Sequence, residues 1–122
     1  MLTWIGLVIS WIVALGIIVI GAAYLAKSAK NAAGFGLPTS PAPDARAWWQ
    51  IKGVRDIASG LLVIVFTFAA RDQLALLMLV LAVIPFGDML VILSNRGDRK
   101  AAYGIHGATA VAMIAAAGLL IA

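Results

Sequence analysis

The sequence predicts an all-α protein, a transmembrane bundle of four helices in antiparallel, up-down order. The 122-residue chain is 64% hydrophobic and only 11% charged, with a mean hydropathy of +1.07. Soluble domains, in contrast, are about half apolar and about a quarter charged. The apolar residues of this chain are gathered into long runs between short polar segments. A run of about 20 such residues is long enough to cross a bilayer as a helix.

The whole chain, residues 1–122, is expected to form one membrane domain, because four spans leave no room for a separate soluble domain. The first run lacks a basic leader and is longer than the apolar core of a typical signal peptide, so we expect it to be retained. Glycines and prolines punctuate the segment that follows it, which predicts a loop. The expected spans are residues 4–25, 53–70, 74–93 and 103–121, with the loop at 26–52.

The distribution of basic residues predicts the orientation in the membrane. Nearly all lysines and arginines lie in or next to the 26–52 loop and the 94–100 connection, whereas Arg71 lies on the opposite side. Cytoplasmic loops retain Lys and Arg, so we expect a multi-pass protein of the cell membrane, with the long loop in the cytoplasm and both termini outside. The net charge of +4 then reflects topology and attraction to anionic lipid, and no nucleic-acid partner is predicted.

Three ionisable side chains fall inside the expected spans at a matching depth: Asp56, Asp88 and His106. Each lies about 9–10 Å inside the nearest polar boundary if the helices rise 1.5 Å per residue. A charge in hydrocarbon is costly unless it is paired or hydrated, and such residues commonly mark functional sites. We therefore predict that these three side chains converge near the cytoplasmic leaflet and act as catalytic residues.

Four further residues are predicted to bind the substrate beside them: Lys52, Arg55, Arg46 and Thr109. Lys52 is spaced i, i+4 from Asp56, so its ammonium can reach that carboxylate along one helix face. Arg55 points about 100° away from Asp56, toward Asp88 or a lipid phosphate. Asp88 has no basic residue within reach on its own helix, so its partner must come from another helix, or its carboxyl must stay neutral.

Backbone signals lie close to these residues. Pro85 removes the hydrogen bond to the carbonyl of Leu81, which predicts a kink beside Asp88. The segment Gly34-Phe35-Gly36 is expected to be a turn that could cap the site. It is not a phosphate-binding loop, because it lacks the Gly-Lys-Ser/Thr ending and a preceding strand.

Simpler structural explanations stay open for each candidate. Asp56 can serve only to neutralise Lys52 or Arg55, because charges within membranes commonly pair with one another. His106 can be an interfacial histidine bonded to a backbone carbonyl, and Pro85 can merely bend a span for packing.

The segments that carry these residues are also similar to a known family. The chain resembles the small four-span membrane proteins catalogued as domain of unknown function 4267 (DUF4267), in order and over nearly its whole length. The motifs that carry the likeness are Gly34-Phe35-Gly36-Leu37-Pro38, Lys52-Gly53-Val54-Arg55-Asp56, Pro85-Phe86-Gly87-Asp88 and His106-Gly107-Ala108-Thr109. The resemblance implies the four-span architecture and supports the choice of Arg55, Asp56, Asp88 and His106. It implies no reaction.

The most concrete functional hypothesis is a membrane-embedded enzyme that binds a lipophilic small molecule and acts on it by acid–base chemistry, such as isomerisation, cyclisation or epoxide opening. Asp88, without a local cation, would be the acid; Asp56 would be the base or a stabilising charge; and His106 would transfer protons. Two alternatives stay open, a proton-coupled small transporter and a non-catalytic accessory or lipid-binding subunit. The size and the four-span plan resemble those of the small multidrug resistance exporters, which work around a carboxylate in the first span. In this chain the first span carries no charge, which weakens the analogy.

Other chemistry is limited by composition. The chain has no cysteine, which excludes disulfides and thiolate sites. Two aspartates and a histidine could bind a divalent cation, but each comes from a separate expected helix, so no metal and no cofactor are predicted. Apart from the lipid bilayer and a lipophilic small molecule, the sequence leaves a second copy of the chain open as a partner.

Overall fold

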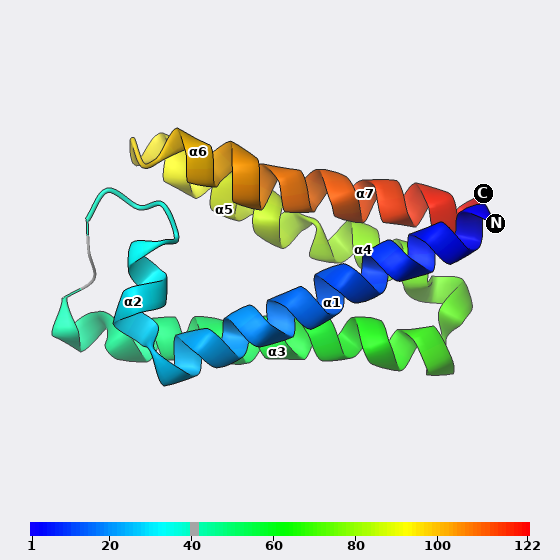
Figure 1. Ribbon diagram of the computed structural model, residues 1–122, viewed down its shortest axis with the longest axis horizontal. Coiled ribbons are helices and arrows are strands. Elements are labelled where there is room, and N and C mark those ends of the chain that lie inside the picture. The colour runs from blue at the N-terminus through cyan, green and yellow to red at the C-terminus, as the bar shows by residue number, and fades with distance from the viewer. Residues whose placement is uncertain (40–41) are drawn as a thin grey trace.

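The computed structural model describes residues 1–39 and 42–122, which form helices joined by short connections, with no strand in these ranges (Figure 1). The all-α prediction is therefore confirmed. In order, the elements are α1 (Leu2–Ala26), α2 (Ser28–Ala33), a 3-10 turn (Pro43–Ala45), α3 (Arg46–Ala69), a 3-10 turn (Arg71–Gln73), α4 (Leu74–Leu81), α5 (Val83–Ser94), α6 (Arg99–Ala101), a π-helical segment (Ala102–Gly107) and α7 (Ala108–Ile121).

The segment expected to be a loop, residues 26–52, is partly helical. Helix α2 occupies its beginning, and α3 already starts at Arg46. The physical reason is that residues 28–33 contain three alanines and no helix breaker, whereas the glycines and prolines are confined to residues 34–43. Residues 40 and 41 of the expected loop lie outside the described residues.

Three helical segments are long and apolar enough to cross a membrane: Leu2–Ala26, Arg71–Ser94 and Arg99–Ile121. This is consistent with an integral membrane protein. Helix α3, with 24 residues, is of similar length, but Lys52, Arg55 and Asp56 lie in its first half and make that half polar. The expected count of four spans therefore does not follow from helix length and composition.

The predicted interruption next to Asp88 is confirmed. Helix α4 ends at Leu81 and α5 begins at Val83, with Ala82 between them. Pro85 has no N–H group to donate to the carbonyl of Leu81, so the helical hydrogen bonds are broken at this turn. The following helix, α5, carries Asp88 on its second turn.

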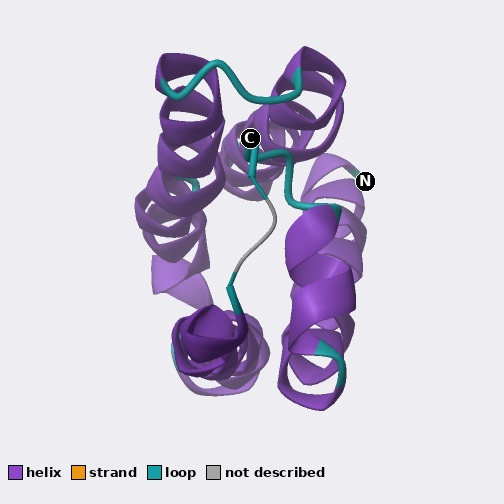
Figure 2. Ribbon diagram, turned by 90° about the vertical axis from the view of Figure 1, so that its left-hand side faces the viewer, coloured by secondary structure: helices purple, strands orange, loops and turns teal. Residues whose placement is uncertain are grey.

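The helices lie side by side, and the two termini meet at one end of the molecule (Figure 1). Helix α2 and the beginning of α3 lie at the opposite end, which Figure 2 shows facing the viewer. Helix α1 packs against α3 and α7, and α4 packs against α7.

Glycines allow the close approach of α1 and α3. A Cβ atom added at Gly21 would lie 2.5 Å from the carbonyl oxygen of Gly53, and one added at Gly53 would lie 2.6 Å from that of Gly21. Such backbone contact is typical of helices that associate within membranes. It brings the polar half of α3 against α1.

Buried apolar side chains form two clusters, one toward each end of the molecule. The cluster near the termini contains Leu7, Ala14, Val63, Leu74, Met78 and Met113, among others. The cluster near α2 contains Tyr24, Ala32, Phe35, Ile92 and Ala102. The candidate site lies between these two clusters.

Candidate functional site

A cavity of about 530 Å³ opens between the helices. Pockets for small molecules commonly have volumes of roughly 300–1,000 Å³ and mostly apolar walls. Here the walls are largely aliphatic, and one end is polar. The aliphatic wall includes Ile12, Val13, Ile17, Ile20, Val63, Leu81, Ile84, Ile105 and Met113, and the polar end includes Lys52, Asp56, Asp88, His106, Ser59 and Thr109.

Asp56 is the most buried charged group at the polar end, with 7% of its side chain exposed. Its Oδ2 atom lies 2.6 Å from Nζ of Lys52, one turn earlier on α3, as the i, i+4 spacing predicts. The same ammonium lies 4.4 Å from the ring centroid of Tyr24, within range for a cation–π contact. Asp56 is therefore held by a cation that is itself held against α1.

Asp88 takes its partner from another helix. Its Oδ2 lies 3.7 Å from Nδ1 of His106, while 30% of the Asp88 side chain and 11% of the His106 side chain are exposed. His106 belongs to the π-helical segment Ala102–Gly107. Such wide turns change the direction in which side chains project and often occur at functional sites.

The other ring nitrogen of His106 fixes its tautomer. Nε2 lies 3.0 Å from the carbonyl oxygen of Phe35, which can only accept a hydrogen bond, so Nε2 carries a proton. Nδ1 then faces Asp88. When the imidazole is neutral, Nδ1 can only accept a hydrogen bond. At 3.7 Å from Oδ2 of Asp88, it lies close enough for an electrostatic interaction but beyond hydrogen-bond distance.

The turn expected at Gly34–Gly36 lies over His106. The Phe35 ring centroid is 4.5 Å from that of His106, and the Phe35 ring also packs against Trp49. Gly36 has a φ of +113°, which a residue with a side chain rarely adopts. Its carbonyl accepts a hydrogen bond of 2.7 Å from the N–H of Asp98, which ties the turn to the α5–α6 connection.

The remaining predicted residues lie in different places. Thr109 lines the cavity, but its hydroxyl donates to the carbonyl of Ile105 on its own helix. Arg55 is exposed and is not part of the cavity wall, and no ion pair joins it to Asp88 within residues 1–39 and 42–122. Arg46 is also exposed and lines a separate hollow at the end of the molecule.

Tyr24 was not predicted as a site residue, but it is 4% exposed and lines the cavity. Its hydroxyl donates to the carbonyl of Asn31, and its ring stacks on Trp49 with 5.6 Å between centroids. The available signal was a single tyrosine at the end of the first apolar run. Phe35 was included in the expected turn, but its carbonyl contact with His106 was not foreseen.

In the part of the chain that the structure describes, no group of three or more His, Cys, Asp or Glu side chains is arranged to hold a metal ion.

The comparisons identify a family but no characterised relative. The family model for a domain of unknown function (DUF4267) matches residues 14–120. No curated protein and no solved structure matches the chain. Because the match covers most of the sequence and includes every candidate site residue, the chain belongs to the DUF4267 family.

Proposed function

We propose that this protein binds a lipophilic small molecule in its cavity and converts it by acid–base catalysis, as in an isomerisation, a cyclisation or an epoxide opening. The single observation that carries the proposal is the composition of the cavity, in which a long aliphatic wall ends at Asp56, Asp88 and His106. Aliphatic walls favour an apolar substrate, and a few convergent polar groups can orient and protonate it.

The proposed roles follow from the environment of each carboxyl. Asp88 lines the cavity and lies 3.7 Å from Nδ1 of His106. In the proposed mechanism its carboxyl is protonated and donates that proton to the substrate. Asp56 is held by Lys52, which favours its ionised form as a base or as a charge that stabilises a developing cation. In an isomerisation or cyclisation, the substrate would gain one proton from Asp88 and lose one to Asp56. Nδ1 of His106 would accept the proton taken up by Asp56 and release it to Asp88, which restores both carboxyls and leaves no net change in protons.

The same proposal includes four membrane spans in one domain of residues 1–122, with adjacent spans antiparallel. Helix α3 supplies the span that composition alone does not identify. Its 24 residues correspond to about 36 Å at 1.5 Å per residue, more than the roughly 30 Å of hydrocarbon in a bilayer. Its Lys52 and Asp56 line the cavity and pair with each other, which lowers the cost of their insertion.

The orientation in this proposal places the α1–α3 and α5–α6 connections in the cytoplasm and both termini outside. What supports it is the concentration of basic residues at the end that carries these connections. The polar end of the cavity then lies in the cytoplasmic half of the membrane.

Untargeted mass spectrometry can test the activity. Purified protein in vesicles would be incubated with a total lipid extract, and the products sought at unchanged mass or at the mass of one added water. The expected result is a product formed by the wild type and by Asp72→Asn, a control carboxyl in the 3-10 turn outside the cavity, but not by Asp88→Asn.

Product formation at the same rate by Asp88→Asn would remove Asp88 from the mechanism. Flux of a compound across the vesicle membrane, driven by a pH gradient and without chemical change, would assign transport in place of catalysis.

A further inference from the structure

The wall of the cavity reaches the surface of the molecule along α1. Two of its lining residues on this helix, Val13 and Ile17, are half-buried, whereas Ile12, Gly16 and Ile20 are exposed. The three exposed residues are spaced i, i+4 and therefore form one stripe along the helix. A Cβ atom added at Gly16 would meet nothing within 4 Å, so the space in front of this stripe is open.

The last helical segment supplies a second edge. Near the termini α1 touches α7, since a Cβ atom added at Gly6 would lie 3.0 Å from the carbonyl oxygen of Ala116. Farther along, α1 crosses away from α7 toward α3 (Figure 1), and Gly16 has no such neighbour. Ile105, in the π-helical segment, is 51% exposed and lines the cavity. These positions indicate an opening between α1 and the π-helical segment.

The end of the cavity toward the termini is closed. Its lining residues there belong to the buried apolar cluster near the termini and are at most 9% exposed: Ala14, Val63, Leu81 and Met113. No ligand can enter from that end without separating these side chains.

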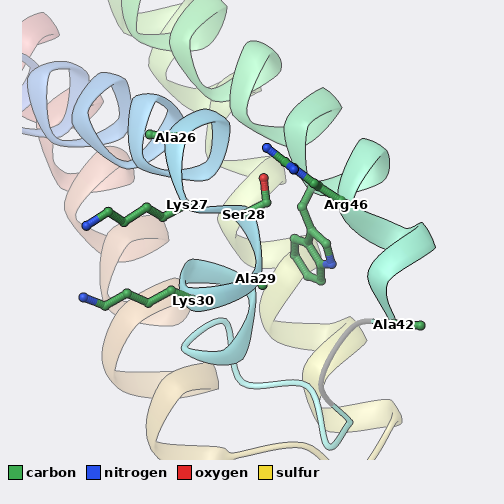
Figure 3. A pocket seen from close by; sticks show the side chains of 8 residues that line it. Ala26, Lys27, Ser28, Ala29, Lys30, Ala42 and Arg46 are labelled. Atoms are coloured by element: carbon green, nitrogen blue, oxygen red, sulfur yellow. The ribbon is translucent and has the colours of Figure 1, made fainter.

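Aromatic side chains cover most of the opposite end. Tyr24 and Phe35 are buried, line the cavity and pack on Trp49. Trp49 in turn lines the hollow at the end of the molecule (Figure 3), which shares only the exposed Lys30 with the cavity wall. Gly34 is also exposed and lines the cavity, so an entry from water beside α2 is the competing route.

We propose that the ligand enters the cavity sideways, from the hydrocarbon of the membrane, through the opening beside Gly16. Its substrate class is then a molecule dissolved in the bilayer and not one delivered from water. This route presupposes the proposed function only in that a lipophilic molecule occupies the cavity.

The apolar character of both edges supports this route. They belong to segments that are long and apolar enough to cross a membrane, Leu2–Ala26 and Arg99–Ile121. Residues 12–20 carry no polar side chain, so an apolar molecule can pass them without entering water. Four isoleucines of the wall are exposed; Ile12, Ile20 and Ile105 border this opening, and Ile84 lies on α5.

A removable plug at residue 16 tests the route, because the chain has no cysteine of its own. Gly16→Cys in vesicles would be modified with benzyl methanethiosulfonate, which adds a ring through a disulfide that a reductant removes. An alkyl diazirine is added to the bilayer, and samples irradiated at successive times give the rate at which Asp56 and Asp88 are labelled. Modification is expected to slow this labelling several-fold, and reduction to restore it.

Two control variants receive the same ring. A Cβ atom at Gly118 also meets nothing within 4 Å, but Gly118 does not line the cavity, so modified Gly118→Cys is expected to keep its unmodified rate. Gly34→Cys places the ring at the α2 edge of the cavity. Its modification is expected to slow labelling less than modification of Gly16→Cys does.

Equal rates before and after modification of Gly16→Cys would overturn the proposal, as would a greater slowing in Gly34→Cys. A lower final extent of labelling, reached without delay, would also overturn it. A ring that only fills the cavity raises the dissociation rate, whereas a blocked opening slows entry and exit alike. Absence of label from both aspartates in the wild type would refute the proposed function together with the route.

Discussion

His106 links the Gly34–Gly36 turn to the carboxyl of Asp88, which lines the cavity. Its Nε2 contacts the carbonyl of Phe35, and its Nδ1 faces Asp88. Because a carbonyl oxygen cannot donate, the neutral imidazole must be the tautomer protonated at Nε2. The assignment of Asp88 as a proton donor depends on this tautomer, which makes it the residue-level claim to examine first.

Nitrogen-15 NMR can examine the tautomer directly, because the chain contains a single histidine. In protein labelled only at histidine, the neutral ring is expected to show a proton on Nε2 and a bare Nδ1. The control is Thr109→Val, which removes a hydroxyl bonded to its own helix and should leave the pattern unchanged. A neutral ring protonated at Nδ1 would contradict the hydrogen bond to Phe35.

Lys52 and Asp56 form the other residue-level unit. Lys52→Met leaves a buried carboxylate without its cation, and removal of one partner of a buried pair costs about 3 kcal/mol or more. The double variant K52M/D56N removes the charge as well and is expected to recover most of that loss in unfolding experiments in detergent. If the double variant were no more stable than Lys52→Met, Asp56 would not depend on Lys52 for its charge.

The two pairs differ in how far they could be predicted. Lys52 and Asp56 lie on one helix, so the sequence spacing alone predicted their contact, and the 2.6 Å ion pair confirms it. Asp88 was predicted only to need a partner from another helix. Its pairing with His106, and the contact of His106 with Phe35 across 71 residues, depend on the π-helical turn and on the path of the 34–36 turn. Neither leaves a periodic pattern in the sequence.

The packing of α1 on α3 determines the position of Asp56 within the bundle. Gly21 and Gly53 contact each other through backbone atoms, and a Cβ atom at Gly21 would also lie 3.0 Å from Cβ of Asp56. Other glycines near the candidate site residues do not serve this packing. A Cβ atom added at Gly87 or Gly104 would meet nothing within 4 Å.

Gly53→Ala tests this helix contact. The added methyl group would lie 2.6 Å from the carbonyl oxygen of Gly21, so the backbone must shift, and overpacking of this kind costs typically about 1–3 kcal/mol. Gly16→Ala on α1 is the matched control, because its Cβ atom would meet nothing within 4 Å. Thermal unfolding in detergent is expected to show a loss for Gly53→Ala and none for Gly16→Ala. Equal stability of the two variants would indicate that α1 and α3 are farther apart than described.

Helix boundaries were predicted better where an apolar run or a proline defined them. The break before Pro85 follows from the missing N–H group, and the structure has it one turn earlier, at Ala82. Helix α2 was missed because glycines and prolines nearby favoured a loop for the whole of residues 26–52. The first turns of α3 were missed because the loop was expected to continue to residue 52, whereas the helix begins at Arg46.

The molecule as a whole has its connections at two ends, with the basic residues concentrated at one of them (Figure 1). Because the chain contains no cysteine, single introduced cysteines give an unambiguous topology measurement with a membrane-impermeant maleimide. We expect Asp44→Cys and Asn95→Cys to react only when the reagent reaches the cytoplasmic side, and Asp72→Cys to react from outside. Reaction of all three from one side would rule out the antiparallel arrangement of α3 with the helix that follows it.

The proposed function requires a lipophilic molecule to enter the cavity and reach its polar end. Photolabelling with an alkyl diazirine, followed by mapping of the labelled residues by mass spectrometry, tests whether one does. Label is expected on Asp88 or Asp56 in the wild type, with a several-fold loss in Thr109→Phe, whose ring would occupy space in the cavity one turn from His106. Label confined to outward-facing residues, and unchanged in Thr109→Phe, would show that the cavity does not bind such a molecule.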